Sequence, residues 1–277
     1  MGARNGGGGA ALRSDRSEDP GLSERDDLLS FAMELADEAD KIAMRYFRRD
    51  LRIDRKPDRT FVTQADTAVE KALRERIEHR YPGHGVLAEE FGDRTAKQET
   101  RWVIDPIDAT HSYMRGIPVF AILIALERAG VMELGIMSAP AMRERWHAAR
   151  GVGAWSGKRR LHVSRVSQLA DAQIFYASRS AFKAVGKERA FDRVIDGAWR
   201  DRGFGDFWGY ALVAEGAGEA MIEPELYSWD LAAPLVIVEE AGGRVTDLEG
   251  RRTYAGGNAL ASNGLLHNAI LKRFNQA

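Results

Sequence analysis

The chain has 277 residues, of which 44% are apolar and 29% charged, and its formal net charge is −1. This fits one large or two moderate globular domains with a substantial core, and it provides no basic field for nucleic acid. The absence of cysteine excludes disulfides, a thiolate nucleophile and a thiolate–zinc site. The longest apolar run, 119–126, is too short to span a membrane, and we expect a cytoplasmic protein.

Residues 1–22 are rich in Gly and Arg and lack the apolar segment of a secretory signal. We expect them to form a disordered tail. Apolar residues recur at helical spacing over 25–50, which predicts a helix. A second amphipathic helix is expected after Thr63, and a short strand over 85–88 should deliver Glu89 to its carboxyl end.

The rest of the chain alternates predicted strands and helices. A strand over 101–104 should deliver Asp105, and a meander over 119–127, 132–138 and 145–149 ends in a loop or hairpin turn over 151–157. Later strands are expected over 174–178, 220–223, 244–247 and 259–262, and later helices over 187–199, 207–215, 231–241 and 265–274. This order implies a layered α/β or α+β architecture, divided into units over 23–155 and 156–277.

Acidic residues occur in three short blocks, 87–92 (LAEEFG), 105–110 (DPIDAT) and 229–234 (WDLAAP). Each block lies at the edge of an apolar segment, where a buried carboxylate is costly unless something compensates it. Hard divalent cations bind through several carboxylate and carbonyl oxygens. The three blocks together therefore predict a metal site, which suits metal-assisted attack of water on phosphorus.

The block 105–110 can hold two ligands close together. Pro106 fixes its own φ and favours an extended Asp105, so Asp105 and Asp108 can point into one cavity with the Ile107 carbonyl between them. The next residues would open a helix whose free N–H groups attract a phosphate. For Asp108 or Asp230 taken alone, a helix N-cap is the simpler explanation, and only the combination of blocks favours a metal.

The blocks 105–110 and 229–233 resemble the two signatures of the inositol monophosphatase superfamily. Glu89, Lys56 and the stretch 62–66 also fit this family in order and spacing, and the resemblance extends over roughly residues 25–275. It implies a Mg²⁺-dependent phosphomonoesterase with two or three ions. It also implies a layered αβαβα sandwich and a homodimer.

The resemblance further implies roles for individual residues. The metal ligands would be Glu89, Asp105, Asp108, Asp230 and the carbonyl of Ile107. Glu89 and Thr110 would orient and activate the attacking water, and Asp66 would act behind them or hold a further metal. Phosphoryl transfer then requires positioning and charge neutralisation, without a protein nucleophile.

Within the superfamily, the sequence looks closest to actinobacterial-type histidinol-phosphate phosphatases, in stretches that include 51–54, 115–119, 145–151 and 202–207. The substrate would contact Ile107, Asp108, Ala109, Thr110, Arg202, Asp206, Glu223 and Asp230. Inositol phosphatases typically have Gly-Thr-Ala where this chain has Gly-Asp-Phe at 205–207. Asp206 would therefore pair with an amine such as that of histidinol, or else cap the following helix.

One residue departs from the first signature, because Ala109 stands where the family has Gly. Alanine keeps the backbone N–H that a phosphate would use, but it adds a methyl group and disfavours positive φ. We expect Ala109 to lie at negative φ where the helix opens. A strained Ala109 that crowds the phosphate is the alternative.

The sequence therefore predicts a phosphatase for a small phosphorylated metabolite, with histidinol phosphate as the leading substrate and no nucleic-acid or membrane partner. An inositol-1-phosphate or sugar-phosphate phosphatase is the alternative within the class. The alternative from another class is a catalytically inactive metabolite-binding protein.

Overall fold

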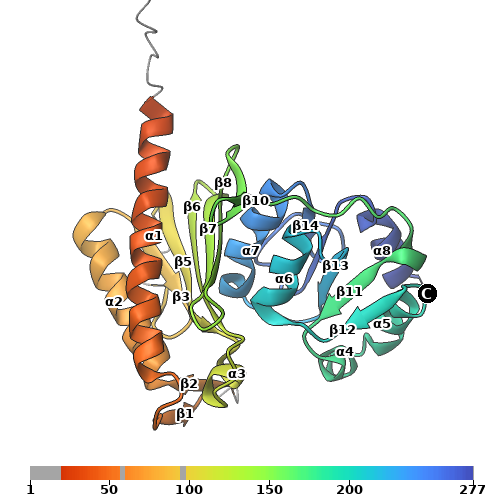
Figure 1. Ribbon diagram of the computed structural model, residues 1–277, viewed down its shortest axis with the longest axis horizontal. Helices are drawn as coiled ribbons and strands as arrows, with labels where there is room; N and C mark the ends of the chain where they lie inside the picture. Colours follow the sequence, from red (N-terminus) through yellow and green to blue (C-terminus); the bar gives the residue numbers. More distant parts are fainter. Residues whose placement is uncertain (1–19, 57–59, 94–97, 277) are drawn as a thin grey trace, which may run out of the picture.

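The computed structural model describes residues 20–56, 60–93 and 98–276, and it consists of alternating layers of helices and sheets. Figure 1 shows helices on one side of a large sheet, further helices on its other side, then a smaller sheet, and helices covering the far face. The predicted αβαβα sandwich is confirmed. Within the described residues, no helix is both long and apolar enough to cross a membrane.

The first layer contains the helices α1 (Pro20–Tyr46) and α2 (Gln64–Arg80), which are joined through a small hairpin of β1 (Ile53–Arg55) and β2 (Phe61–Thr63). Helix α2 begins with a capping box: the Thr63 hydroxyl accepts from the Ala65 N–H at 3.1 Å, and the Asp66 carboxylate accepts from the Thr63 N–H at 2.8 Å. This reciprocal pair fixes the start of the helix. It also fixes the place of Asp66.

The large sheet has the strand order β10-β9-β8-β7-β6-β5-β3-β4. Its strands are β3 (Gly85–Ala88), β4 (Gly92–Asp93), β5 (Thr100–Asp108), β6 (Ala121–Arg128), β7 (Val131–Ala139), β8 (Glu144–Ala149), β9 (Gly153–Ser156) and β10 (Arg159–Arg160). Most neighbours are antiparallel, but β3 and β5 are parallel. Their carboxyl ends therefore meet at one edge of the sheet, so the chain places Glu89 beside the end of β5.

The smaller sheet has the order β12-β11-β13-β15-β14. Its strands are β11 (Gln173–Tyr176), β12 (Arg200–Arg202), β13 (Ala220–Glu223), β14 (Arg244–Thr246) and β15 (Ala259–Ser262), and the short helices η1 (Leu169–Asp171), α4 (Arg179–Ala184), α5 (Glu188–Ile195) and α8 (His267–Phe274) belong to the same half of the chain. Between the two sheets lie α6 (Asp206–Ala214) and α7 (Ser228–Glu240).

Helix α7 is the centre of the molecule, because it contacts strands of both sheets. Residues 231–238 are all buried, as expected for a helix that is apolar all round. Helix and large sheet approach very closely at Gly135, where an added Cβ would lie 2.5 Å from the carbonyl oxygen of Ala233. Only glycine fits this contact, which holds the start of α7 against the sheet.

The structure differs from the sequence prediction in several elements. Part of 151–157 is strand β9, and α4 and β12 were not predicted. Helix α7 begins at Ser228, before the predicted start at residue 231, and contains Pro234 in its interior. The predicted tail 1–22 lies mostly outside the described residues, and residues 20–22 belong to α1. The division near residue 155 stays a prediction.

Candidate active site

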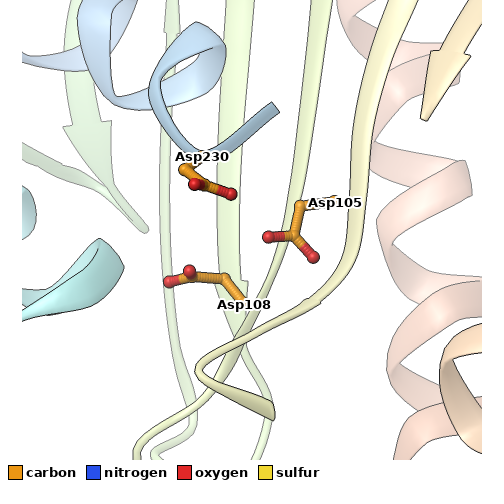
Figure 2. Close-up of side chains that lie close together, drawn as sticks. All are labelled: Asp105, Asp108 and Asp230. Carbon is orange, nitrogen blue, oxygen red and sulfur yellow. The ribbon is translucent and has the colours of Figure 1, made fainter. Parts of the chain in front are cut away.

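Three carboxylates from two distant parts of the chain meet at the edge of the large sheet. Asp105, Asp108 and Asp230 each offer an oxygen atom, and these atoms all lie within 4.8 Å of one another. Figure 2 shows the first two side chains at the end of β5 and the third in the first turn of α7, all pointing into one space. The structure thus brings together two of the three acidic blocks directly.

A β-bulge makes this arrangement possible. Side chains three residues apart on a regular strand point to opposite faces of the sheet. Strand β5 continues through Pro106 instead of ending at Asp105: Asp105 pairs with Leu123 and Asp108 with Ala121, so β5 uses one residue more than β6 between these pairs. The extra residue turns both carboxylates to the same side.

Backbone N–H groups hold the two half-buried ends of the cluster. Asp230 accepts from the Tyr227 N–H at 2.7 Å, which closes the capping box at the start of α7. Asp108 accepts from the Phe207 N–H at 2.7 Å. Both residues are therefore caps as well as members of the cluster. Asp108, however, caps α6 from the other half of the chain.

The carboxylates of the cluster have no basic partner in the described part of the chain. Among the described residues, no ion pair joins Asp105, Asp108 or Asp230 to a basic side chain. Asp105 is 2% exposed, and burial, followed by the charges of Glu89 and Asp108, raises its pKa well above the usual range. Burial raises the pKa of Asp230 to about 7. Such a set of oxygens fits a divalent cation, because ionising them all without one is unfavourable.

Glu89 lies next to this cluster, and its carboxylate is hydrogen-bonded to Lys56. The Lys56 ammonium donates to Glu89 and to Glu90, each at 2.8 Å. Burial alone would lower the pKa of Lys56, but these two bonds raise it above its ordinary value. The charge of Glu89 in turn contributes to the raised pKa of Asp105, which places the two carboxylates in one electrostatic group.

Two further predicted residues lie near these acids, since Thr110 directly follows the turn after β5 and the charge of Asp66 contributes to the raised pKa of Asp105. The Thr110 hydroxyl donates to the Ile107 carbonyl at 2.9 Å, which leaves the hydroxyl oxygen able to accept a hydrogen bond. Asp66 is fully buried, and its Oδ1 atom has no hydrogen-bond partner among the residues that the structure describes. Burial raises the pKa of Asp66 to about 6. A buried acceptor of this kind favours a water or a cation in front of it.

The expectation for Ala109 was wrong. Ala109 has φ 64° and ψ 45°, which is the left-handed region. The bulge and the immediate start of α3 (Thr110–Met114) require this turn of the backbone. The methyl group of Ala109 packs against the cluster of buried residues under α1 and α2. Because α3 is a single turn, a phosphate would meet individual N–H groups here more than a helix dipole.

The residues expected around the leaving group are only partly assembled. Glu223 is 6% exposed and accepts from the Tyr210 hydroxyl, and burial raises its pKa to about 8. Burial also raises the pKa of Asp206, an effect opposed by the charge of His111. Arg202 donates to the Asp201 carbonyl at 2.7 Å and forms no ion pair with a described carboxylate, so its predicted contact has no support from this geometry.

Sequence reasoning gave no role to one buried pair of residues near the site. Glu70 and Arg74 on α2 form an ion pair at 2.8 Å, and they also bond to the backbone of the segment that carries Glu89. The pattern could have been found, because Asp66, Glu70 and Arg74 lie at successive spacings of four on one helix and share a face.

Comparison with known proteins agrees with this geometry. The model of the inositol monophosphatase family matches residues 24–277. The chain belongs to the inositol monophosphatase family. It is accordingly a phosphoric monoester hydrolase.

Its relatives include two histidinol-phosphatases. That of Mycobacterium tuberculosis is 48% identical over 90% of this chain and 98% of its own length. That of Streptomyces coelicolor is 45% identical over 90% of this chain and 97% of its own length. Among solved structures, an IMPase of Thermotoga maritima superposes with a TM-score of 0.82 at 30% identity, covering 90% of this chain and 97% of that one.

Proposed function

We propose that this phosphatase of the inositol monophosphatase family requires Mg²⁺ and hydrolyses histidinol phosphate to histidinol and phosphate. The observation that carries the proposal is the similarity to histidinol-phosphatases over nearly the whole chain. The acids on the leaving-group side of the site give it a physical reason.

The residues that would hold Mg²⁺ are Glu89, Asp105, Asp108, Asp230 and the carbonyl of Ile107. Their fit rests on donor chemistry, because all of them are hard oxygen ligands, buried or half-buried. Burial raises the pKa values of Asp105, Asp108 and Asp230 where no cation is present. When bound, two or three Mg²⁺ ions would supply charge neutralisation for the phosphate and acidify a water.

The chain itself orients the nucleophile. The Thr110 hydroxyl is fixed by its bond to Ile107, so its lone pairs are directed and can accept a hydrogen bond from water. Glu89 accepts the proton of that water as the new O–P bond forms. The bond from phosphorus to the leaving oxygen breaks, that oxygen takes a proton from solvent water and leaves as an alcohol, and Glu89 returns its proton to solvent. Asp66 supports this arrangement from behind.

The leaving-group side is selective through charge. Four carboxylates would balance two divalent cations, and Asp206 and Glu223 are two further acids without a basic partner among the described ion pairs. A cationic alcohol such as histidinol gains from this excess of negative charge, whereas a neutral polyol does not. We therefore assign Asp206 to the substrate amine.

The decisive experiment is phosphate release with Mg²⁺ from histidinol phosphate, inositol-1-phosphate, fructose-1,6-bisphosphate and 3′-phosphoadenosine 5′-phosphate. We expect the highest kcat/KM for histidinol phosphate. A preference for inositol-1-phosphate would support the alternative of an inositol monophosphatase, which the likeness to the Thermotoga IMPase favours. No turnover of any substrate would support the inactive binding protein.

A variant separates the role of Asp206 from a purely structural one. Asp206→Asn should weaken use of histidinol phosphate by about 1.5–3 kcal/mol, the usual range for a charge-assisted hydrogen bond. It should scarcely change the hydrolysis of glycerol phosphate, whose alcohol part carries no charge. An equal loss on both substrates would show that Asp206 has a structural role only.

The remaining expectations stay proposals. They are a homodimer, a cytoplasmic location, the number of metal ions, and a substrate contact by Arg202. Size-exclusion chromatography with light scattering tests the first. A Mg²⁺ titration by calorimetry tests the stoichiometry.

A further inference from the structure

Two side chains of α2 hold the segment that carries Glu89 through hydrogen bonds to its backbone. Glu70 on α2 accepts from the Glu90 N–H at 2.7 Å and from the Phe91 N–H at 3.0 Å. Arg74, one turn later, donates to the carbonyl oxygens of Val86 and Gly92. One acid and one base therefore bind four backbone groups across residues 86–92.

This clamp is buried and fully paired. The Glu70 side chain has no exposed surface, and the Arg74 side chain is 11% exposed. Both carboxylate oxygens of Glu70 are used, one by Glu90 and the other by Phe91 and Arg74. A buried ion pair contributes little to stability compared with apolar residues of similar size. Its presence therefore calls for another explanation, and its four backbone bonds provide one.

We infer that Glu70 and Arg74 are positioning residues that set the place of the Glu89 carboxylate in the metal site. The inference rests on the proposed Mg²⁺ dependence. Neither residue would touch the metal. Glu70 accepts from the two backbone N–H groups that directly follow Glu89. Arg74 donates to one carbonyl before Glu89 and to one after it. These bonds fix the backbone of the turn, so the Glu89 side chain cannot rotate out of the metal site.

The same helix links two of the site's acids. Asp66 lies four residues before Glu70, so both side chains leave α2 on one face. Asp66 is fixed by the capping box at Thr63, and the turn at Glu89 is fixed by Glu70. Helix α2 thus sets the relative place of Asp66 and Glu89, two residues that follow different strands.

The chemistry of the clamp requires a carboxylate at position 70. It accepts three hydrogen bonds at once. A glutamine has one acceptor oxygen and an NH₂ group, and that NH₂ would face an N–H donor in a buried space. Glu70→Gln therefore keeps the size of the side chain and releases part of the turn.

The test is calorimetric titration of metal-stripped protein with Mg²⁺, with phosphate release measured over a range of Mg²⁺ concentrations. Glu70→Gln should weaken Mg²⁺ binding by about 10–100-fold, the usual effect of losing a group that orients a metal ligand. Because Glu70 does not touch the metal, saturating Mg²⁺ should restore most of the turnover. Glu89→Gln should not be rescued in this way.

Glu219→Gln is the matched control. Glu219 is also buried, and its carboxylate also accepts from a backbone N–H, that of Gln173 at 2.6 Å, and from the Ser164 hydroxyl at 2.8 Å. It precedes β13, at the end of that strand opposite to Glu223. This variant should lose thermal stability like Glu70→Gln and keep wild-type Mg²⁺ affinity.

Wild-type Mg²⁺ affinity in Glu70→Gln, or an equal loss of affinity in Glu219→Gln, would overturn the inference. If Glu70→Gln does not fold, Arg74→Lys replaces it. Lysine keeps the charge but cannot reach both carbonyls, so weaker Mg²⁺ binding is again expected, and unchanged binding is again contrary. A wild-type protein that does not bind Mg²⁺ would instead refute the proposed function.

Discussion

Replacing Ala109 by glycine should reveal the strain stored at the metal site. An L-residue in the left-handed region costs about 1–2 kcal/mol, and Ala109 at φ 64° lies in that region. Glycine removes this cost. It also frees the unfolded chain, which costs about 0.4–1 kcal/mol, and it gives up a half-buried methyl group, about half of 0.8 kcal/mol. The net change in the free energy of unfolding should thus lie near zero or be a small gain.

The matched control is Ala141→Gly. Ala141 is also half-buried against the same cluster of residues, and it is not among the described residues with positive φ. It has no strain to release, so its replacement should lose about 1 kcal/mol from entropy and packing. The two variants should differ by the strain alone, about 1–2 kcal/mol.

The assay is thermal unfolding of both variants beside wild type. At roughly 2–4 °C per kcal/mol for a chain of this size, Ala109→Gly should melt about 2–8 °C above Ala141→Gly. Turnover of Ala109→Gly should stay within a few-fold of wild type, because the methyl packs away from the acids. Equal losses of melting temperature in the two variants would refute the proposed strain at Ala109. A gain of tenfold or more in turnover would show that the methyl crowds the phosphate.

Three further outcomes are expected. Asp105→Asn should abolish both Mg²⁺ binding and turnover with the fold retained, and full turnover in excess chelator would contradict the metal site. Glu89→Gln should lower kcat far more than it raises KM, because Glu89 is proposed to act on the water; near-normal kcat in this variant would be evidence against that role. Burial raises the pKa of Asp230 to about 7 and that of Glu223 to about 8, whereas both lie near 4 in an unfolded chain. Between about pH 6.5 and 8 the folded, metal-free protein therefore holds more protons than the unfolded one, and its melting temperature should fall as pH rises. Saturating Mg²⁺ should make the melting temperature depend less on pH. An equal pH dependence with and without Mg²⁺ would be evidence against a link between these protonations and Mg²⁺ binding.

Much of the site could be predicted because its residues lie in short segments with local rules. The spacing of Asp105 and Asp108 around Pro106 indicated two carboxylates in one cavity, and the cluster confirms that they meet with Asp230. The roles assigned to Glu89 and Thr110 stay predictions. The family and the layered fold were also predicted, since both depend on signatures and on element order that the sequence displays directly.

The errors arose where tertiary contacts decide the local structure. Ala109 takes positive φ because the bulge in β5 and the start of α3 leave no other path, against the preference of alanine itself. Helix α7 begins before the predicted residue 231 and tolerates Pro234 in its interior, because packing around this buried helix outweighs the lost hydrogen bond. The short edge strand β12 has no apolar alternation that would reveal it in the sequence. It forms because it pairs with β11.

The hydrogen bond between the Phe207 N–H and Asp108 joins the two halves of the chain, so the complete site can form only when both halves have folded. Asp108 and Asp230 are far apart in the sequence, so during synthesis the first acids leave the ribosome long before the last. Closing so long a loop is slow, and no early intermediate contains the complete set of ligands. A cation that needs this set can slow unfolding without accelerating folding. Mg²⁺ would then stabilise the protein by slowing its unfolding, and it would not initiate folding.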